Sequence, residues 1–316
     1  MSEFDLIRDY FQWSNPPSSV GLGVGDDAAI LRVPAGCDLA VSVDTFNAGI
    51  HFPPETPPHA VGYKALAVNL SDLAAMGAEP AWFTLAVSLP EANREWIAEF
   101  VRGIQELAQQ HGIFLVGGDT TRGALSITIQ VMGFVRGQAL LRSGARHGDL
   151  VCVSGTLGDA AAGLAIVQQR LVMLTEAATH CIGRLNYPTS RNALVEILRG
   201  HAHACMDVSD GLLADLGHIL KASGVGAKLY HQAVPLSAAL LQLPLEQRLL
   251  FALTGGDDYE LLFTLTPESF GQVKEAAAQR GILLTAIGEI DENLTDLRLD
   301  YELLNQKRGY DHFSAN

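Results

Sequence analysis

The sequence predicts a mixed α/β (α+β) fold divided into two domains. The chain has 316 residues, which is about twice the ~150 residues typical of one domain. Both halves alternate strand-like and helix-like apolar patterns. Between them, residues 136–149 are rich in glycine and arginine and show no periodicity. We therefore expect an N-terminal α/β domain over residues 1–145 and a C-terminal α/β domain over residues 146–316.

The segment 39–44 is an expected strand with an unusual polar face. Its alternation places Ser42 and Asp44 on one face and Val41 and Val43 on the other. The other elements expected in the N-terminal half are a helix after Pro58 that ends at Gly77, a strand over 81–88, a helix after Pro90 that ends at Gly112, and a strand over 124–135. The C-terminal half is expected to contain a strand from Leu150, helices near 158–170, 190–199, 210–222 and 267–280, and strands near 203–208, 259–265 and 282–287.

Composition and charge exclude several classes of function. The formal net charge is −14, and an acidic chain repels phosphate backbones and anionic membrane surfaces. We expect neither nucleic acid nor a membrane as partner. No apolar run reaches the ~18 residues of a membrane helix, and the acidic first ten residues are unlike a signal peptide, so we expect a cytoplasmic protein. Four cysteines without a CxxC pair predict buried thiols rather than zinc or disulfides: Cys37, Cys152, Cys181 and Cys205.

Short acidic clusters beside glycines or at expected element ends are the main candidate chemistry. They are Gly25-Asp26-Asp27, Ser42-Val43-Asp44, Ser71-Asp72, Gly117-Gly118-Asp119, Asp207-Val208-Ser209-Asp210-Gly211 and Gly255-Gly256-Asp257-Asp258. Any one of them is explained by a plain turn or helix cap. Two features favour a site: several clusters continue strongly apolar strands, and Asp72 lies at the C-terminal end of a helix, where the dipole disfavours a carboxylate.

Carboxylates that converge repel one another and therefore gather protons or cations. Hard oxygen ligands without histidine–cysteine clusters select Mg²⁺, Mn²⁺ or Ca²⁺ over zinc. Magnesium held by few carboxylates completes its coordination with water and substrate phosphates, which favours nucleotide chemistry. The sequence has no GxxxxGK[ST] motif and no protein-kinase motif set, so the common nucleotide-binding folds are excluded.

Six strings, in order, resemble the thiamine-monophosphate kinase family. They are GVGDDAAIL, VSVDTFNAGIHF, YKALAVNLSDLAAMGAEP, VGGDTTRG, MDVSDGLLADLGHI and GGDDYELLF. The resemblance extends over nearly the whole chain. The resemblance implies a two-domain fold of the aminoimidazole ribonucleotide synthetase type. It further implies a homodimer in which the N-terminal sheets of two subunits form a barrel. The implied activity is ATP-dependent phosphorylation of thiamine monophosphate to thiamine diphosphate, with several Mg²⁺ ions between acidic residues of the two domains.

The resemblance also implies residue roles. The implied metal ligands are Asp27, Ser42, Val43 through its main chain, Asp44, Asp72, Asp119, Asp207 and Asp210. The implied ATP contacts are Gly118, Asp119, Arg142 and Ser209, and the implied acceptor contacts are His51, Asp257 and Tyr310. Relatives commonly have glutamate at the position of Asp257, and a contact from Asp258 or a bridging water would compensate for the shorter arm.

The expected reaction is direct in-line transfer of the γ-phosphoryl group of ATP to the acceptor phosphate. No general base is assigned, because the acceptor oxygen is already largely anionic. Catalysis then rests on positioning and on charge neutralisation by the metal cluster and Arg142. Two alternatives remain at this point: a sister ATP-dependent synthetase of the same superfamily acting on another substrate, and a non-catalytic Ca²⁺- or Mg²⁺-binding module.

Overall fold

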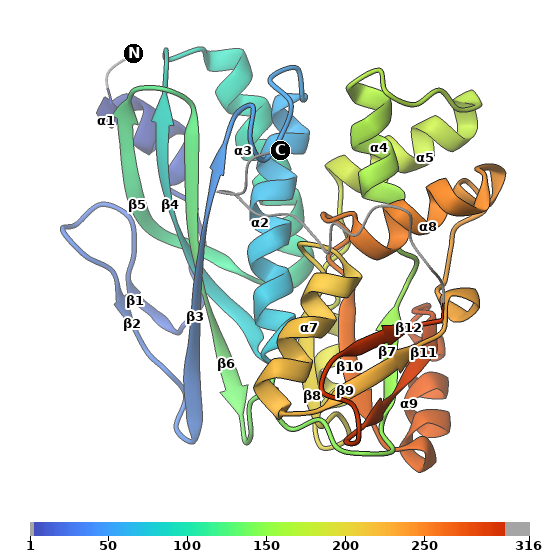
Figure 1. Cartoon of the computed structure of the whole chain (residues 1–316). Coiled ribbons are helices and arrows are strands. Elements are labelled where there is room, and N and C mark those ends of the chain that lie inside the picture. Colours follow the sequence, from blue (N-terminus) through green and yellow to red (C-terminus); the bar gives the residue numbers. More distant parts are fainter. Residues whose placement is uncertain (1–2, 301–316) are drawn as a thin grey trace. The chain divides into compact units, whose positions relative to one another are not determined.

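The computed structural model describes residues 3–300 and shows two compact units. The N-terminal unit comprises residues up to 73 together with 78–137. The C-terminal unit comprises 74–77 and the chain from 138 onward. Each unit has its own β-sheet with helices packed on it (Figure 1). The two-domain mixed α/β fold is confirmed, and the position of the boundary at 145/146 stays a prediction.

The N-terminal unit is built on a four-stranded sheet in the order β3-β6-β4-β5. Its strands are β3 (Cys37–Asn47), β4 (Glu79–Leu89), β5 (Phe114–Arg122) and β6 (Ser126–Arg136). The pairs β3–β6 and β6–β4 are antiparallel, and β4–β5 is parallel. The sequence analysis missed β5, because its GGDTTR half lacks the apolar alternation of a strand.

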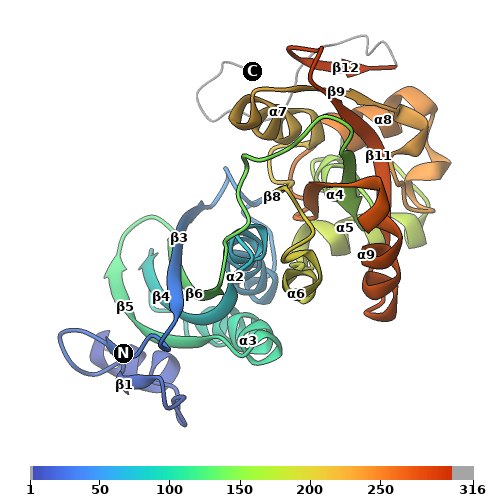
Figure 2. The same ribbon diagram turned by 90° about the horizontal axis from the view of Figure 1, so that it is seen from below.

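Helices α2 (Pro58–Ala75) and α3 (Arg94–His111) cover one face of this sheet (Figures 1 and 2). They cross closely at two glycines: a Cβ on Gly62 would stand 2.0 Å from the carbonyl oxygen of Phe100, and a Cβ on Gly103 would stand 2.0 Å from that of His59. The helix α3 is capped by the side chain of Asn93. Small elements complete the unit: α1 (Glu3–Leu6), η1 (Ile7–Phe11), β1 (Val20–Leu22) and β2 (Ile30–Leu31).

The polar face of β3 is turned inward, which inverts the usual burial of a strand. Val41 and Val43 are 51% and 56% exposed, whereas Ser42 and Asp44 are partly buried on the same face as the fully packed Phe46. A strand ordinarily buries its apolar face. The sequence predicted the alternation correctly, but the direction of each face depends on what the polar residues contact.

The C-terminal unit is built on a six-stranded sheet in the order β12-β9-β11-β7-β10-β8. Its strands are β7 (Leu150–Ser154), β8 (Ala204–Asp207), β9 (Gly226–Leu229), β10 (Leu261–Leu265), β11 (Leu284–Asp291) and β12 (Leu297–Leu299). All pairs are antiparallel except β12–β9. The strands β9 and β12 were missed by the sequence analysis, since each is only a few residues long.

Helices cover both faces of this second sheet. They are α4 (Asp159–Val167), α5 (Thr175–Asn186), α6 (Val195–Leu198), α7 (Leu212–Ser223), α8 (Leu245–Thr254) and α9 (Pro267–Gln279), with short helices η2 (Asn192–Leu194), η3 (His231–Ala233) and η4 (Leu240–Gln242). On one face Leu216 packs with Val151 and Val153. On the other, Val273 packs with Cys152 and Phe263. The central strands are therefore buried on both faces.

The helix expected near 190–199 is corrected to the short η2 and α6, because Pro188 and the polar run after it delay helix formation. Three of the four cysteines are buried, as predicted, and burial raises the pKa of Cys152 and of Cys181 to about 12. Within residues 3–300, no helix has both the length and the apolar character that crossing a membrane requires.

Candidate functional site

Two elements of the N-terminal unit bring Ser42, Asp44 and Asp72 together. Ser42 and Asp44 share the inward face of β3, and Asp72 lies in the last turn of α2. The hydroxyl Oγ of Ser42 donates a hydrogen bond of 2.6 Å to Oδ2 of Asp72. Burial and, secondarily, repulsion from Asp72 raise the pKa of Asp44 from 3.8 to about 6. The two carboxylates therefore lie close enough to repel each other.

The carboxylates of Asp44 and Asp72 are suitable ligands for a hard cation. Its donors are all oxygens, which Mg²⁺ and Ca²⁺ prefer, and a bound cation would reverse both the Asp44–Asp72 repulsion and the unfavourable helix dipole at Asp72. Within the described part of the chain, no group of three or more histidine, cysteine or acidic side chains is close enough to hold a metal ion. A cation bound here would therefore need further oxygen ligands from substrate or water.

The other predicted acidic residues of the N-terminal unit lie on other elements, and the structure does not show them in contact with this pair. Asp27 is exposed in the β1–β2 connection, where its own N–H donates to Asp26. Asp119 is exposed on β5 and is paired in register with Ala86. Gly118 next to it has φ +153°, and a Cβ there would stand 1.9 Å from the carbonyl oxygen of Leu85. Only glycine fits at that position.

His51 lies just beyond the end of β3, in a fixed orientation. Its Nδ1 accepts a hydrogen bond of 3.0 Å from the backbone N–H of Asn47. Its ring stacks on Phe46, with 5.3 Å between ring centroids and 21° between planes. Because Nδ1 is the acceptor, the neutral ring carries its proton on Nε2. The imidazole is a preorganised donor rather than a loose side chain.

In the C-terminal unit, Asp207 is the last residue of β8, and the loop from there to α7 carries Ser209 and Asp210. The backbone N–H groups of Ser209, Asp210 and Gly211 all donate to Oδ2 of Asp215, each at 3.1 Å. Burial, followed by repulsion from Asp207 and Asp210, raises the pKa of Asp215 to about 7. Asp215 was missed by the sequence analysis. Its signal was an acidic residue in the first turn of a helix, six residues after Ser209, where it can accept from the loop that precedes the helix.

The segment 255–260 lies against this same loop. The N–H of Asp257 donates to the carbonyl oxygen of Ser209 at 2.9 Å, and the N–H of Tyr259 donates to that of Val208 at 2.8 Å. Asp257 and Tyr259 both have left-handed φ values, +70° and +51°. The Tyr259 hydroxyl donates to Oδ1 of Asp257 at 3.1 Å. The structure thus brings Asp257 next to the predicted nucleotide contact Ser209.

Asp258 does not offer the alternative contact expected from the sequence. It is 1% exposed, and its Oδ2 accepts a hydrogen bond of 2.7 Å from the N–H of Gly158 at the start of α4. Burial raises its pKa well above the usual range. Asp258 caps a helix and is not accessible to a substrate.

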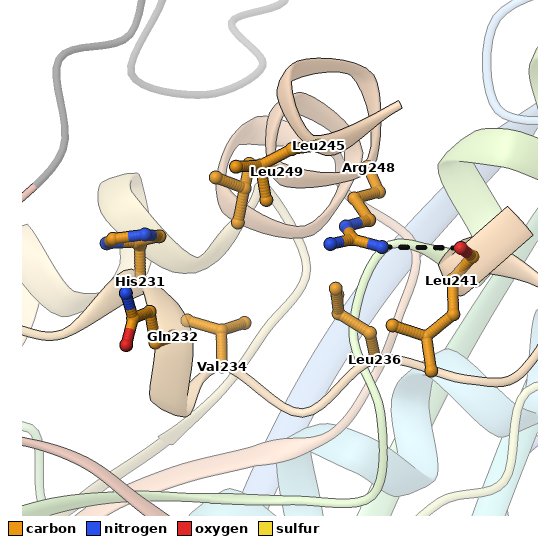
Figure 3. A pocket seen from close by; sticks show the side chains of 8 residues that line it. All are labelled: His231, Gln232, Val234, Leu236, Leu241, Leu245, Arg248 and Leu249. Atoms are coloured by element: carbon orange, nitrogen blue, oxygen red, sulfur yellow. Dashed lines mark hydrogen bonds between the residues drawn. The ribbon is translucent and has the colours of Figure 1, made fainter. Parts of the chain in front are cut away.

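The remaining predicted residues are Arg142 and Tyr310. Arg142 is exposed on the segment that leads into β7, and its carbonyl oxygen accepts a hydrogen bond of 3.5 Å from the Ser223 hydroxyl. Tyr310 lies outside the described residues. A cavity of about 370 Å³ in the C-terminal unit is lined by aliphatic side chains together with His231, Gln232 and Arg248 (Figure 3). It contains none of the predicted site residues.

The raised pKa of Asp44 predicts a pH dependence of divalent-cation binding. Below about pH 6 the carboxyl is largely protonated in the free protein, so binding must expel a proton, and apparent Mg²⁺ affinity should fall up to about tenfold for each pH unit below that value. At pH 8 no proton is released from Asp44. Calorimetry of Mg²⁺ binding at pH 5.5 and at pH 8, in two buffers of different ionisation enthalpy, measures the release. Equal affinity and no proton release at pH 5.5 would contradict a ligand role for Asp44.

Comparison with known proteins identifies the family of the chain. The family described as AIR synthase related protein matches with its N-terminal domain over residues 25–135 and with its C-terminal domain over residues 146–296. Thiamine-monophosphate kinase of Escherichia coli strain K12 is 46% identical over 99% of this chain and 98% of its own length. That of Haemophilus influenzae is 41% identical over 100% of this chain and 99% of its own.

Solved structures of the same family are also similar to this chain. A crystal structure of thiamine-monophosphate kinase from Stenotrophomonas maltophilia matches with a TM-score of 0.86 and 47% identity, over 95% of this chain and 96% of that one. A complex of AaThiL with AMPPCP and TMP matches with a TM-score of 0.80 and 30% identity, over 98% and 96% of the two chains. With full-length identity at this level to several such enzymes, the chain belongs to the thiamine-monophosphate kinase family.

Proposed function

We propose that this protein transfers the γ-phosphoryl group of ATP directly onto the phosphate of thiamine monophosphate, by an in-line, Mg²⁺-assisted reaction that yields thiamine diphosphate and ADP. The observation that carries the proposal is a relative of the same fold, 30% identical over almost the whole chain, that was solved with AMPPCP and TMP together. AMPPCP keeps the three phosphates of ATP but cannot give up the last one. A donor and an acceptor bound at once favour direct transfer between them.

Oxygen donors of both units support the metal part of the proposal. The residues that would hold Mg²⁺ are Asp27, Ser42, the main chain of Val43, Asp44, Asp72, Asp119, Asp207 and Asp210. When bound, the ions neutralise charge on the phosphates of donor and acceptor. The observation in support is electrostatic: burial and, after it, repulsion from neighbouring carboxylates raise the pKa values of Asp44 and Asp215, so each unit holds partly buried negative charge that a cation would stabilise.

The residues proposed to hold ATP are Gly118, Asp119, Arg142 and Ser209. Gly118 is required by the close approach of the Leu85 backbone of β4, and it lies directly before the proposed ligand Asp119 on β5. The exposed guanidinium of Arg142 supplies charge-assisted hydrogen bonds to phosphate in an acidic protein. Ser209 sits in the loop whose three amides are fixed by Asp215.

The residues proposed to hold thiamine monophosphate are His51, Asp257 and Tyr310. Nε2–H of His51 is oriented by the Asn47 amide and by stacking on Phe46. Asp257 is oriented by the Tyr259 hydroxyl and offers a carboxylate to the cationic thiazolium. An aromatic ring such as that of Tyr310 can stack on the pyrimidine and face the cation.

No general base is needed for this reaction, because the acceptor phosphate oxygen is already largely anionic at neutral pH. The protein's part is to hold two polyanions in line and to exclude competing water. Direct transfer predicts a single inversion at phosphorus. ATP made chiral at the γ-position with sulfur and oxygen isotopes should therefore give thiamine diphosphate of inverted configuration. Net retention would indicate two transfers through a phosphorylated enzyme and would contradict the in-line proposal.

A homodimer through the N-terminal sheet also belongs to the proposal. The outward face of β3 exposes Leu39, Val41 and Val43 by 40–56%, and a row of apolar side chains on an exposed strand is typical of a protein interface. A second copy of this chain, adding its own β3, would bury this row and close the two sheets into a barrel. Sedimentation equilibrium of the purified protein and of Val41→Glu tests this. We expect a dimer that the charge disrupts, and a monomeric wild-type protein would contradict it.

A further inference from the structure

We propose that Arg184 and Arg191 are positioning residues for the acceptor: through the carboxylate of Glu260 they fix the backbone turn that presents Asp257. The inference rests on the proposed function, in which Asp257 contacts thiamine monophosphate. Neither arginine carries a role in the site described above. Both lie in the C-terminal unit, Arg184 on α5 and Arg191 just before η2.

The two guanidinium groups converge on one fully buried carboxylate. Arg191 donates from Nε to Oε2 of Glu260 and from Nη2 to Oε1, each at 2.5 Å, in a bidentate pair. Arg184 donates from Nη2 to Oε1 at 2.8 Å. The hydroxyl of Ser154 on β7 donates to Oε2 at 2.6 Å. Glu260 is 0% exposed. Water therefore does not compete for its carboxylate, and these four hydrogen bonds fix the position of the side chain.

The Glu260 side chain is also held by close packing against Gly155. Gly155 has φ +58°, and a Cβ there would stand 2.2 Å from Oε1 of Glu260. The Ser154 hydroxyl that donates to Glu260 also accepts from the N–H of Leu261 at 2.9 Å, which fixes the first residue of β10. The carboxylate is thus locked on its polar side by the arginines and on its other side by β7.

The locked carboxylate sits at the end of a strained segment. Asp257 and Tyr259, with φ +70° and +51°, both occupy the left-handed region. Residues other than glycine remain there only when their surroundings over-determine the backbone. Arg184 provides one such restraint directly, because its Nη2 also lies 3.4 Å from the carbonyl oxygen of Asp258 in the middle of the turn. The other restraint is Glu260 itself, whose carbonyl oxygen accepts from the N–H of Val208 at 2.8 Å.

The nucleotide side of the site has an additional anchor. The loop containing Ser209 and Asp210 shares backbone hydrogen bonds with residues 257–260, but it is also held by Asp215 of α7, whose three bonds to the loop do not involve the arginines. Loosening the Glu260 anchor should therefore displace Asp257 more than Ser209. A kinetic consequence follows, namely that the KM for thiamine monophosphate should rise while the KM for ATP stays nearly constant.

The variant Arg191→Lys tests this, because lysine keeps the positive charge but cannot reproduce the bidentate fork. We expect its KM for thiamine monophosphate to rise about tenfold or more, since displacements of about 1 Å at a reacting centre have effects of this size or larger. Its KM for ATP should change less than about twofold. The matched control is Arg280→Lys, whose guanidinium pairs with Glu196 at 3.2 Å on the exposed surface, and which should leave both constants unchanged.

Arg184→Lys, which keeps the Arg191 pair intact, serves if Arg191→Lys does not fold, and the same split is expected for it. Hydrogen exchange of the amides of residues 256–260 supplies a readout that needs no activity, and exchange should accelerate in the variant but not in the control. Equal rises in both KM values, or unchanged exchange and unchanged KM for thiamine monophosphate, would overturn the inference. A wild-type protein that forms no thiamine diphosphate would refute the proposed function instead, and the exchange result would still decide whether the arginines hold the turn.

Discussion

Asp44→Asn should lower kcat by about 100-fold or more at saturating Mg²⁺, a loss of the size seen when a preorganised charge at a reacting centre is removed. An amide keeps the shape of the side chain and a carbonyl oxygen, but it lacks the charge with which Asp44 would hold a cation. The inward position of Asp44 on β3, within reach of Asp72, is unchanged by the substitution. Steady-state kinetics across a Mg²⁺ titration measures the effect.

The same substitution should stabilise the metal-free protein. A carboxyl whose pKa is raised by folding contributes stability that is fully present below its unfolded value and is lost as pH rises through the folded value. The rise from 3.8 to about 6 in Asp44 corresponds to roughly 3 kcal/mol at pH 8. Removing the charge should raise Tm by about 5 °C there and leave Tm unchanged below about pH 3.

The matched control for both effects is Asp38→Asn, which changes an exposed aspartate on the same strand and should alter neither turnover nor Tm. Lower activity together with higher metal-free stability is the signature of a residue kept for function. An Asp44→Asn protein with near-normal turnover at saturating Mg²⁺ would contradict the assignment, whatever its Tm.

Asp215→Ala should lower kcat/KM for ATP by about 100-fold, because it leaves three backbone N–H groups of the β8–α7 loop without their acceptor. These amides belong to Ser209, Asp210 and Gly211, so the loop that is proposed to contact ATP and metal loses its shape. The KM for thiamine monophosphate should change less, since the segment containing Asp257, although hydrogen-bonded to this loop, is also held through Glu260.

Asp215→Asn is the informative comparison. A single oxygen, Oδ2, accepts all three hydrogen bonds, and a correctly oriented amide oxygen can replace it. The pKa of about 7 shows that the neutral carboxyl already competes with the charged form at neutral pH. Asparagine should therefore retain most of the activity that alanine loses. Equal losses in the two variants would show that the charge of Asp215, and not its place as an acceptor, is what matters.

Much of the fold could be predicted from periodicity, and the failures have physical causes. The helices α4, α7 and α9 and the long strands β4 and β6 follow strong apolar patterns and were predicted close to their observed bounds, whereas β3 was predicted over 39–44 and spans Cys37–Asn47. The helices α5 and α8 were missed, since each offers only a partial apolar stripe to its neighbours. Short strands such as β9 and β12 are defined by pairing partners, which a local pattern does not contain.

The sequence predicted which residues belong to the candidate site, but it did not predict how these residues contact one another. The repulsion between Asp44 and Asp72 could be anticipated from their chemistry, whereas the pairing of Ser42 with Asp72 depends on how α2 packs on β3. The loop role of Asp215 and the burial of Asp258 were not anticipated, because each depends on backbone amides that only the folded chain brings near. Asp257 and Tyr259 adopt the left-handed backbone conformation, which the sequence GGDDYE does not predict.

The measurement that tests the central claim most directly follows the label of ATP carrying ³²P in its γ-phosphate. The purified protein is incubated with this ATP, Mg²⁺ and thiamine monophosphate, with free thiamine as the comparison acceptor and chelated metal as the control. The account predicts that the label appears in thiamine diphosphate in amounts equal to the ADP formed, and only when Mg²⁺ is present. Label released as inorganic phosphate while thiamine monophosphate stays unchanged would contradict it.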